Sequence, residues 1–184
     1  MSRENDLFKA FLDGDKSSFE QIVISFKDNL IYFINRYVHS LSLAEEIAED
    51  SFVALLLHKN SFNFKYSVKT YLFAIGKNKA LNAIKKNKRH RQEPLSDFEY
   101  SLQDNFALEE KVLENERKRM INVCLGRIKS DYSSVLYLYY FEQMDKQECS
   151  KILKKSKKQI ENLLYRGREA LKKELEKEGI GYEI

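Results

Sequence analysis

A polar helical stripe near the C-terminal end carries the side chains best able to form directed hydrogen bonds with a ligand. A helix over residues 156–175 has a polar side with Lys158, Asn162, Tyr165 and Glu169, flanked by Glu161 and Arg166. In the DNA major groove, asparagine pairs with adenine, arginine with guanine and a carboxylate with cytosine. We therefore expect DNA contacts, with Lys157 at the turn holding a phosphate, from Lys157, Lys158, Gln159, Glu161, Asn162, Tyr165, Arg166 and Arg168. The alternative is an ordinary solvated helix.

A second stripe lies on a helix predicted over residues 68–89. Its polar side carries Asn78, Asn82, Lys85 and Arg89. Small residues on the opposite side, Gly76, Ala80 and Ala83, would let another helix approach closely.

The loop before this helix contains Phe62, Asn63, Phe64 and Tyr66, and Ser67 is the expected helix cap. Aromatic rings beside a basic helix suit single-stranded nucleic acid, whose unstacked bases need rings to stack on. The alternative is that Phe62 and Phe64 fill the core beneath the loop, and we expect at least one of them to do so.

Two capping boxes frame the first stripe. Asp145 with Glu148, and Ser156 with Gln159, fit the pattern in which a cap side chain and a residue three positions later satisfy each other's backbone N–H groups. The segment KILKKS (151–156) leaves room for one helix end and a tight turn. This spacing predicts a helix-turn-helix, although no glycine marks the turn.

The whole chain has the composition of a helical protein. One proline and six glycines in 184 residues disfavour sandwiches and barrels. We predict an all-α protein with helices over 7–12, 19–38, 43–58, 67–89, 119–129, 133–142, 145–153 and 156–177. These form two small domains, residues 1–92 and 118–184, joined by an acidic linker over 93–117. No apolar run reaches the length of about 18 residues that a membrane span requires, so we expect no membrane insertion.

The net charge of +4 is unevenly distributed along the chain. Residues 51–92 contain ten basic and no acidic side chains, whereas residues 93–116 contain eight acidic ones and only Lys111. Residues 151–173 contain nine basic and two acidic side chains. This pattern indicates two separate surfaces for a polyanion. The alternative is that the lysine-rich helices are merely solvated.

Nothing in the sequence indicates an enzyme. The three histidines, His39, His58 and His90, are scattered without cysteines or carboxylates at metal-ligand spacing. A glycine-rich phosphate loop and a nucleophile elbow are both missing from the sequence. We expect no catalytic residue, no metal and no cofactor, and we expect Cys124 and Cys149 to be small core residues of a reduced cytoplasmic protein.

Three segments resemble the extracytoplasmic-function (ECF) group of bacterial sigma-70-type sigma factors. AEEIAEDSF (44–52) is similar to the family's core-binding segment AEDLVQETF. VKTYLFAIGKNKALNAIKK (68–86) is similar to a family run in which tryptophan stands at the place of Tyr71. The stretch 135–171, VLYLYYFEQMDKQECSKILKKSKKQIENLLYRGREAL, resembles the family's helix-turn-helix pattern.

The resemblance implies a transcription initiation factor that binds core RNA polymerase and directs it to promoter DNA. Residues 1–92 would bind the polymerase β′ clamp helices through Glu46, Ile47, Glu49, Asp50 and Phe52. They would also recognise and melt the −10 element through Phe62, Asn63, Phe64, Tyr66, Tyr71, Asn78, Asn82, Lys85 and Arg89. Residues 118–184 would bind the β flap and the −35 element. The family commonly has an anti-sigma factor as a further partner.

The chain departs from the family pattern at several positions. Glu46 and Glu49 replace an aspartate and a glutamine, and Lys154 replaces the glycine of the turn. Leu163 replaces a frequent arginine, and Glu161 a basic residue, so the −35 sequence recognised here stays open. The alternative function is a helix-turn-helix regulator without sigma activity, which would bind duplex DNA as a dimer without polymerase.

Overall fold

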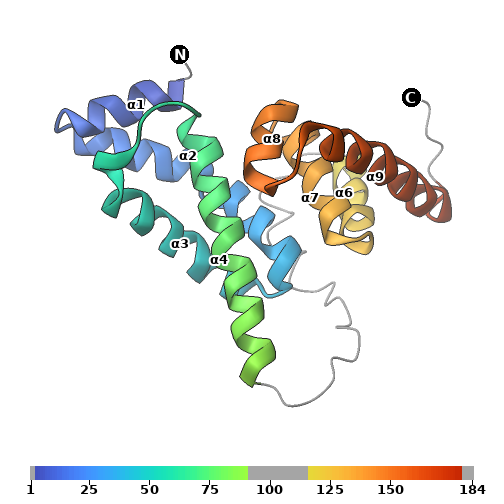
Figure 1. The fold of residues 1–184 in the computed structure, drawn as a ribbon. Helices are drawn as coiled ribbons and strands as arrows, with labels where there is room; N and C mark the ends of the chain where they lie inside the picture. The colour runs from blue at the N-terminus through green and yellow to red at the C-terminus, as the bar shows by residue number, and fades with distance from the viewer. Residues whose placement is uncertain (1–2, 91–115, 180–184) are drawn as a thin grey trace. The chain divides into compact units, whose positions relative to one another are not determined.

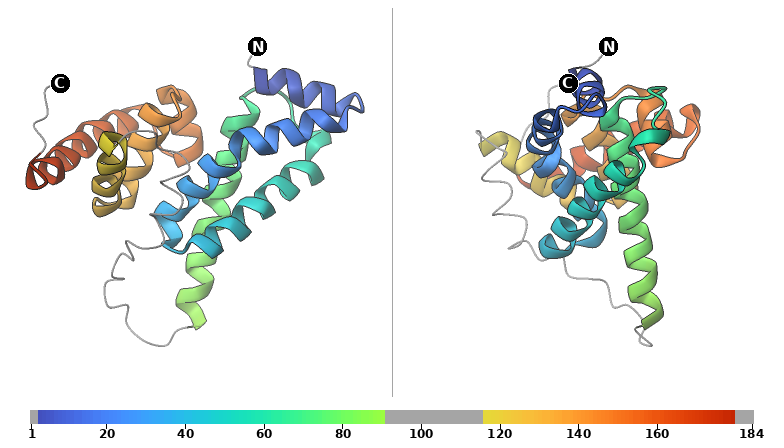
Figure 2. Two further views of the ribbon diagram at one scale, coloured as in Figure 1. Left: turned by 180° about the vertical axis from the view of Figure 1, so that it is seen from behind. Right: turned by 90° about the vertical axis from the view of Figure 1, so that its left-hand side faces the viewer.

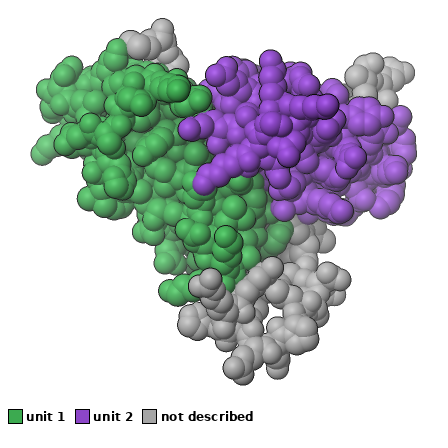
Figure 3. Space-filling view, viewed as in Figure 1, with its two compact units in different colours: residues 1–92 green, residues 93–184 purple. Residues whose placement is uncertain are grey.

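The computed structural model describes residues 3–90 and 116–179, and every element in these ranges is helical (Figure 1). The predicted all-α class is confirmed for this part of the chain. The chain divides into two compact units, residues 1–92 and 93–184, coloured separately in Figure 3. The predicted linker lies outside the described residues except for Glu116 and Arg117.

Helix α2 is the centre of the first unit. This unit contains α1 (Arg3–Leu12), α2 (Lys16–Val38), α3 (Leu41–Leu57), a 3₁₀ turn η1 (Lys59–Ser61) and α4 (Val68–His90). Helix α2 packs against α1, α3 and α4, which Figure 2 shows from two further sides. Its apolar residues therefore supply much of the core, including Ile22, Phe26, Leu30, Ile31, Phe33 and Ile34.

Polar side chains set the ends of these helices. The Asp15 carboxylate begins α2 by accepting from the Ser17 N–H at 3.0 Å, and hydrogen bonds from Ser18 and Ser17 lower its pKa. Helix α2 ends at His39, which adopts a left-handed conformation with φ 51°. Ser40 then caps α3 by accepting from the Leu43 N–H at 3.4 Å. The chain thus reverses between α2 and α3 within two residues.

Helices α2 and α4 approach each other closely at Gly76. A Cβ atom at Gly76 would lie 3.0 Å from Leu30 Cδ1 and 3.1 Å from Ile34 Cδ1, and the neighbouring Ala80 is fully buried. The close approach expected from these small residues is confirmed. It packs one side of α4 against the core and leaves the opposite side for the polar stripe.

The first turn of α4 is buried and donates two backbone hydrogen bonds to side-chain oxygens. The Thr70 N–H donates to Ser67 Oγ at 3.0 Å, which confirms Ser67 as the cap. The Val68 N–H donates to Asn5 Oδ1 of α1 at 2.9 Å. Val68 and Thr70 have no exposed surface, and leaving a buried N–H without an acceptor costs about 1–3 kcal/mol. The start of α4 therefore depends on α1.

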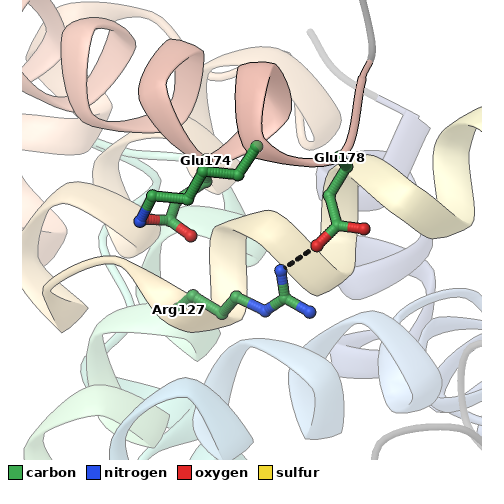
Figure 4. Close-up of polar contacts among 4 residues, drawn as sticks. Arg127, Glu174 and Glu178 are labelled. Atoms are coloured by element: carbon green, nitrogen blue, oxygen red, sulfur yellow. Dashed lines mark hydrogen bonds and ion pairs between the residues drawn. The ribbon is translucent and has the colours of Figure 1, made fainter.

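The second unit is built around its last helix. It contains α6 (Glu116–Arg127), α7 (Ser130–Leu136), a π-helical turn η2 (Tyr137–Phe141), α8 (Lys146–Leu153) and α9 (Lys157–Lys177). Helix α9 packs against α6, α7 and α8. Arg127, at the end of α6, forms an ion pair with Glu178 just beyond α9 (Figure 4).

The single helix predicted over residues 133–142 is wrong in detail. Helix α7 begins at Ser130, and the winding changes to π at Tyr137, where the Glu142 N–H donates to the Tyr137 carbonyl at 3.1 Å. The rings of Tyr137 and Phe141 stack with centroids 5.5 Å apart. Over a single turn, the spacing of hydrophobic residues does not distinguish an α-helix, with hydrogen bonds between residues four apart, from a π-helix, in which they are five apart.

Both cysteines are fully buried free thiols, as expected. Burial raises the pKa of the Cys149 thiol to about 12 and also raises that of Cys124. Because a thiol reacts as the thiolate, both residues are chemically inert where they lie, and they pack as small apolar side chains.

Both predicted capping boxes are present in the helix-turn-helix. The Glu148 N–H donates to Asp145 Oδ1 at 2.8 Å, and the Asp145 N–H donates to Glu148 Oε2 at 3.0 Å. In the second box, the Gln159 N–H donates to Ser156 Oγ at 3.3 Å and the Ser156 N–H to Gln159 Oε1 at 2.7 Å. These bonds satisfy the backbone donors at the start of α8 and α9.

The turn itself is made without glycine. Lys154 ends α8 in the left-handed conformation, with φ 54° and ψ 47°. That conformation costs a residue other than glycine about 1–2 kcal/mol. The backbone of Lys154, which joins the two helices of the motif, is therefore locally strained.

Replacing Lys154 by glycine relieves this strain. Because glycine loses about 0.5–1 kcal/mol of backbone entropy, we expect K154G to stabilise the protein by about 0.5–1 kcal/mol in urea unfolding followed by circular dichroism. The control is K151G, at an exposed right-handed position of α8, which should destabilise by about 1 kcal/mol. A K154G protein less stable than the parent would contradict the prediction.

Candidate nucleic-acid and polymerase surfaces

Helix α9 presents the first polar stripe to solvent. All eight predicted residues of this stripe are exposed: Lys157, Lys158, Gln159, Glu161, Asn162, Tyr165, Arg166 and Arg168. The opposite side of α9 is buried at Ile160, Leu164, Gly167 and Leu171. A Cβ atom at Gly167 would lie 3.2 Å from Leu136 side-chain atoms, so α9 lies close against α7. Tyr165 is 63% exposed, so its phenol side chain is accessible to a ligand.

Three of these eight side chains are held within the motif. Gln159 completes its capping box, and Arg168 Nη1 donates to Tyr140 Oη at 3.3 Å. Lys146 of α8 donates to Glu161 Oε1 at 3.0 Å, and this hydrogen bond lowers the pKa of Glu161. Glu161 is therefore a carboxylate paired with Lys146 in the free chain, whereas Lys158, Asn162 and Tyr165 lie on the outward side of the helix.

An open pocket of about 680 Å³ adjoins one edge of this stripe. It lies where η2, the start of α8 and the start of α9 converge. Its lining combines two phenol rings with charged side chains: Tyr139, Tyr140, Gln143, Met144, Asp145, Lys146, Gln147, Lys157 and Glu161. Two of the residues predicted to contact DNA, Lys157 and Glu161, thus line this open pocket.

Helix α4 presents the second stripe. Asn82 and Lys85 are exposed and Asn78 is half-buried, while the side chain of Arg89 lies outside the described part of the structure. Tyr71, also half-buried, falls on the same side of the helix and extends the stripe toward the preceding loop. Loop and stripe therefore form one continuous surface.

The aromatic residues of the loop pack on α1. The Phe8 ring of α1 has no exposed surface and lies 5.2 Å from the Phe62 centroid and 6.3 Å from that of Phe64. Phe62 and Phe64 meet edge to face at 4.8 Å, and Phe62 lies 5.4 Å from Tyr71. The expectation that at least one of the two rings fills the core is met only in part, because both are half-buried against Phe8 and neither is fully buried.

The tip of the loop is polar and its backbone is constrained. Asn63 is exposed, and its Oδ1 accepts from the Lys65 N–H at 3.1 Å. Phe64 between them has φ 55°, a conformation that is strained for a bulky side chain. Lys9 Nζ lies 5.3 Å from the Phe64 centroid, a cation–π distance. Aromatic packing with α1 holds Phe64 in this conformation.

Helix α3 carries the residues predicted to bind polymerase, and two of them need correction. Ile47 is 5% and Phe52 6% exposed, because both lie on the side of α3 that packs into the core with Ala44, Ala48 and Leu55. Their side chains are not available to a partner in this conformation. Glu46, Glu49 and Asp50 are exposed on the opposite side.

Two exposed apolar residues on that outer side were missed. Val53 is 52% and Leu57 77% exposed, and helical spacing places both beside Glu46, Glu49 and Asp50. These five residues, here called the α3 outer stripe, combine acidic and apolar surface. The signal was present in the sequence, since a helix that is apolar nearly all round exposes part of that surface.

Neighbouring lysines partly neutralise the α3 outer stripe. Lys27 of α2 lies 3.7 Å from Glu49, and Lys79 of α4 lies 3.3 Å from Asp50. Solvent-exposed ion pairs of this kind contribute about 0–1 kcal/mol, so a partner can replace them at little cost.

Comparison with known proteins matches both units to one family. Residues 22–90 match the family model for sigma-70 region 2, and residues 118–171 match the model for sigma-70 region 4. The ECF RNA polymerase sigma factor SigW of Bacillus subtilis is 26% identical over 170 residues, covering 88% of this chain and 91% of that protein. The RNA polymerase sigma-H factor of Pseudomonas aeruginosa is 22% identical over 184 residues, covering 95% and 94%.

Solved structures share the fold. CnrH, in complex with the cytosolic domain of CnrY, aligns with a TM-score of 0.65 at 19% identity, covering 95% of this chain and 98% of CnrH. The sigma factor RpoE from Bartonella quintana, in complex with the anti-sigma factor NepR, aligns with a TM-score of 0.64 at 17% identity, covering 86% and 96%. Within residues 3–90 and 116–179, no helix has the length and apolarity to cross a membrane.

Regions 2 and 4 occur here in the family's order, on a two-unit helical fold, with a capped helix-turn-helix in the second unit. The chain therefore belongs to the sigma-70 family, as a transcription initiation factor of the ECF group.

Proposed function

We propose that the two polar stripes divide promoter recognition between them. The α9 stripe binds the −35 element as duplex, and the α4 stripe with its loop binds the −10 element as single strand. One observation carries this assignment. In each unit one helix exposes a polar side, and the opposite side of that helix packs closely on the core at a buried glycine. On α9, Asn162 and Arg166 contact base edges, and the lysines contact phosphates.

The energetics of opening support the assignment of α4. Unstacking DNA costs about 1.4 kcal/mol per base step. Each base stacked on an aromatic side chain returns about 1–3 kcal/mol. Because Phe62 and Phe64 are half-buried against Phe8, the exposed Asn63 and the Asn78–Asn82 side of α4 are the groups that reach bases. The two rings form the wall against which a base rests.

The α3 outer stripe is the proposed contact with the β′ clamp helices of core polymerase. Its three carboxylates fit a basic surface, and Val53 and Leu57 supply apolar area that is exposed in the free chain. The second unit binds the β flap. Further parts of the proposal are an anti-sigma factor as regulator, action in the cytoplasm, and no requirement for a cofactor or metal.

The direct test is transcription by purified core polymerase supplemented with this chain on genomic promoter fragments. We expect specific initiation, with permanganate-reactive thymines in the −10 element. N78A should reduce that reactivity while closed complexes still form. N87A, an exposed asparagine on the same helix, is the matched control. Specific binding of duplex by the chain alone, without polymerase-dependent transcription, would instead favour the helix-turn-helix regulator.

Base recognition by α9 is tested by alanine substitution. N162A and R166A should each weaken binding of the holoenzyme to its −35 sequence by about 1–3 kcal/mol, because a bidentate base contact is lost. E176A, exposed near the end of the same helix, should have no effect. If affinity for random DNA falls equally, the two residues contact phosphates.

The polymerase contact is tested at Leu57. L57E should weaken binding of core polymerase by about 1 kcal/mol or more, since a charge enters the apolar part of the interface. I24E changes an apolar residue of α2 that is 81% exposed, outside the α3 outer stripe. Fluorescence anisotropy of labelled chain titrated with core polymerase measures both. Equal affinities of L57E and wild type would remove Leu57 from the interface.

A further inference from the structure

We propose that α1 is a working part of the −10 site, and that Asn5 is the residue through which α1 positions α4 for strand capture. This inference rests on the proposed function of α4. Nothing in the sequence pattern of residues 3–12 indicates such a role, since Asn5 is one polar residue among several on a short helix.

The first step is the hydrogen bond that crosses the unit. Asn5 Oδ1 accepts from the Val68 N–H at 2.9 Å, although 63 residues separate the two positions. Asn5 is 7% exposed and Val68 fully buried, so water cannot substitute for the amide. An acceptor from another helix therefore serves the first N–H of α4, in addition to the cap Ser67 just before the helix.

The second step is that Ser67 and Asn5 together fix both the start of α4 and its position relative to α1. Ser67 Oγ accepts from the Thr70 N–H at 3.0 Å and lies 2.8 Å from Thr70 Oγ1, which fixes the local start of α4. Asn5 fixes where that start lies relative to α1. Together they determine where the loop ends and where the stripe of Asn78 and Asn82 begins.

The third step is that α1 also supports the loop before α4. One turn after Asn5, Phe8 supports Phe62 and Phe64, and Phe62 in turn contacts Tyr71 on α4. Asn5 and Phe8 thus hold opposite ends of the same segment, residues 62–68. A shift of α1 would move the loop wall and the start of α4 together, while leaving the α3 outer stripe and the second unit unchanged.

The proposal therefore predicts that a change at Asn5 weakens capture of single-stranded −10 DNA but leaves binding of polymerase and of duplex −35 DNA unchanged. N5L keeps the γ-branched shape of the side chain, in a larger volume, and removes the acceptor, whereas N5D keeps an acceptor oxygen at the same place. We expect N5L holoenzyme to bind a single-stranded −10 oligonucleotide about tenfold more weakly, with N5D close to wild type. D6N, at an exposed neighbouring position on α1, is the control.

The experiment uses the full chain assembled with core polymerase. Anisotropy with the fluorescent −10 oligonucleotide measures capture, retention of a duplex −35 fragment measures the second unit, and titration of polymerase measures assembly. The proposal predicts loss of capture by N5L with the other two quantities unchanged, and rescue by N5D. Circular dichroism at the assay temperature confirms that each variant is folded, and N5A, which removes the acceptor without adding volume, provides a second route to the same loss if N5L is not.

The outcomes are distinct. Equal capture by N5L and wild type overturns the proposal, and so does a uniform loss of capture, duplex retention and assembly, which would make Asn5 a residue of general stability. Failure of the wild-type holoenzyme to bind the oligonucleotide at all would instead overturn the −10 assignment of α4.

Discussion

Two glycines on the packed sides of α4 and α9 set the geometry on which the rest of the molecule depends. Leu30 and Ile34 of α2 approach Gly76 so closely that a Cβ atom would lie 3.0–3.1 Å from them, and Leu136 of α7 approaches Gly167 to 3.2 Å. Because interiors pack to crystal-like density, such contacts leave each helix little freedom to rotate. The polar stripe on the far side therefore faces outward in a defined direction. In both units, the proposed recognition of DNA depends on how closely the opposite side of the helix is packed.

The loop before α4 is ordered by aromatic packing and a cap rather than by turn residues. Phe8, Phe62, Phe64 and Tyr71 make a chain of edge-to-face contacts, and this chain holds Phe64 in a left-handed conformation. Such strain persists where the surroundings over-determine it, and it is common at sites of function. The N-terminal helix thus contributes to the same surface as residues some sixty positions later, a distance bridged by the Asn5–Val68 bond.

Charge is less segregated in space than along the chain. The acidic residues of α3 meet Lys27 and Lys79 from the flanking helices, and Glu161 meets Lys146 across the helix-turn-helix. These exposed pairs are weak, so they mask charge in the free chain without preventing its use by a partner. Surfaces of this kind are consistent with a protein that binds DNA only together with polymerase.

The sequence alone determined whatever depends on residues close together in the chain. Capping boxes, helix spacing and the two polar stripes act over three to seven positions, so the helix-turn-helix and the sides of α4 and α9 were predictable. The tertiary structure decided which residues of α3 are core and which are surface, because Ile47 and Val53 differ only in what packs against them. It also decided that Lys154 adopts a conformation usual for glycine, and that Asn5 caps a helix 63 residues away. Contacts between segments far apart leave no periodic signal, since the position of each partner is set only when the helices pack.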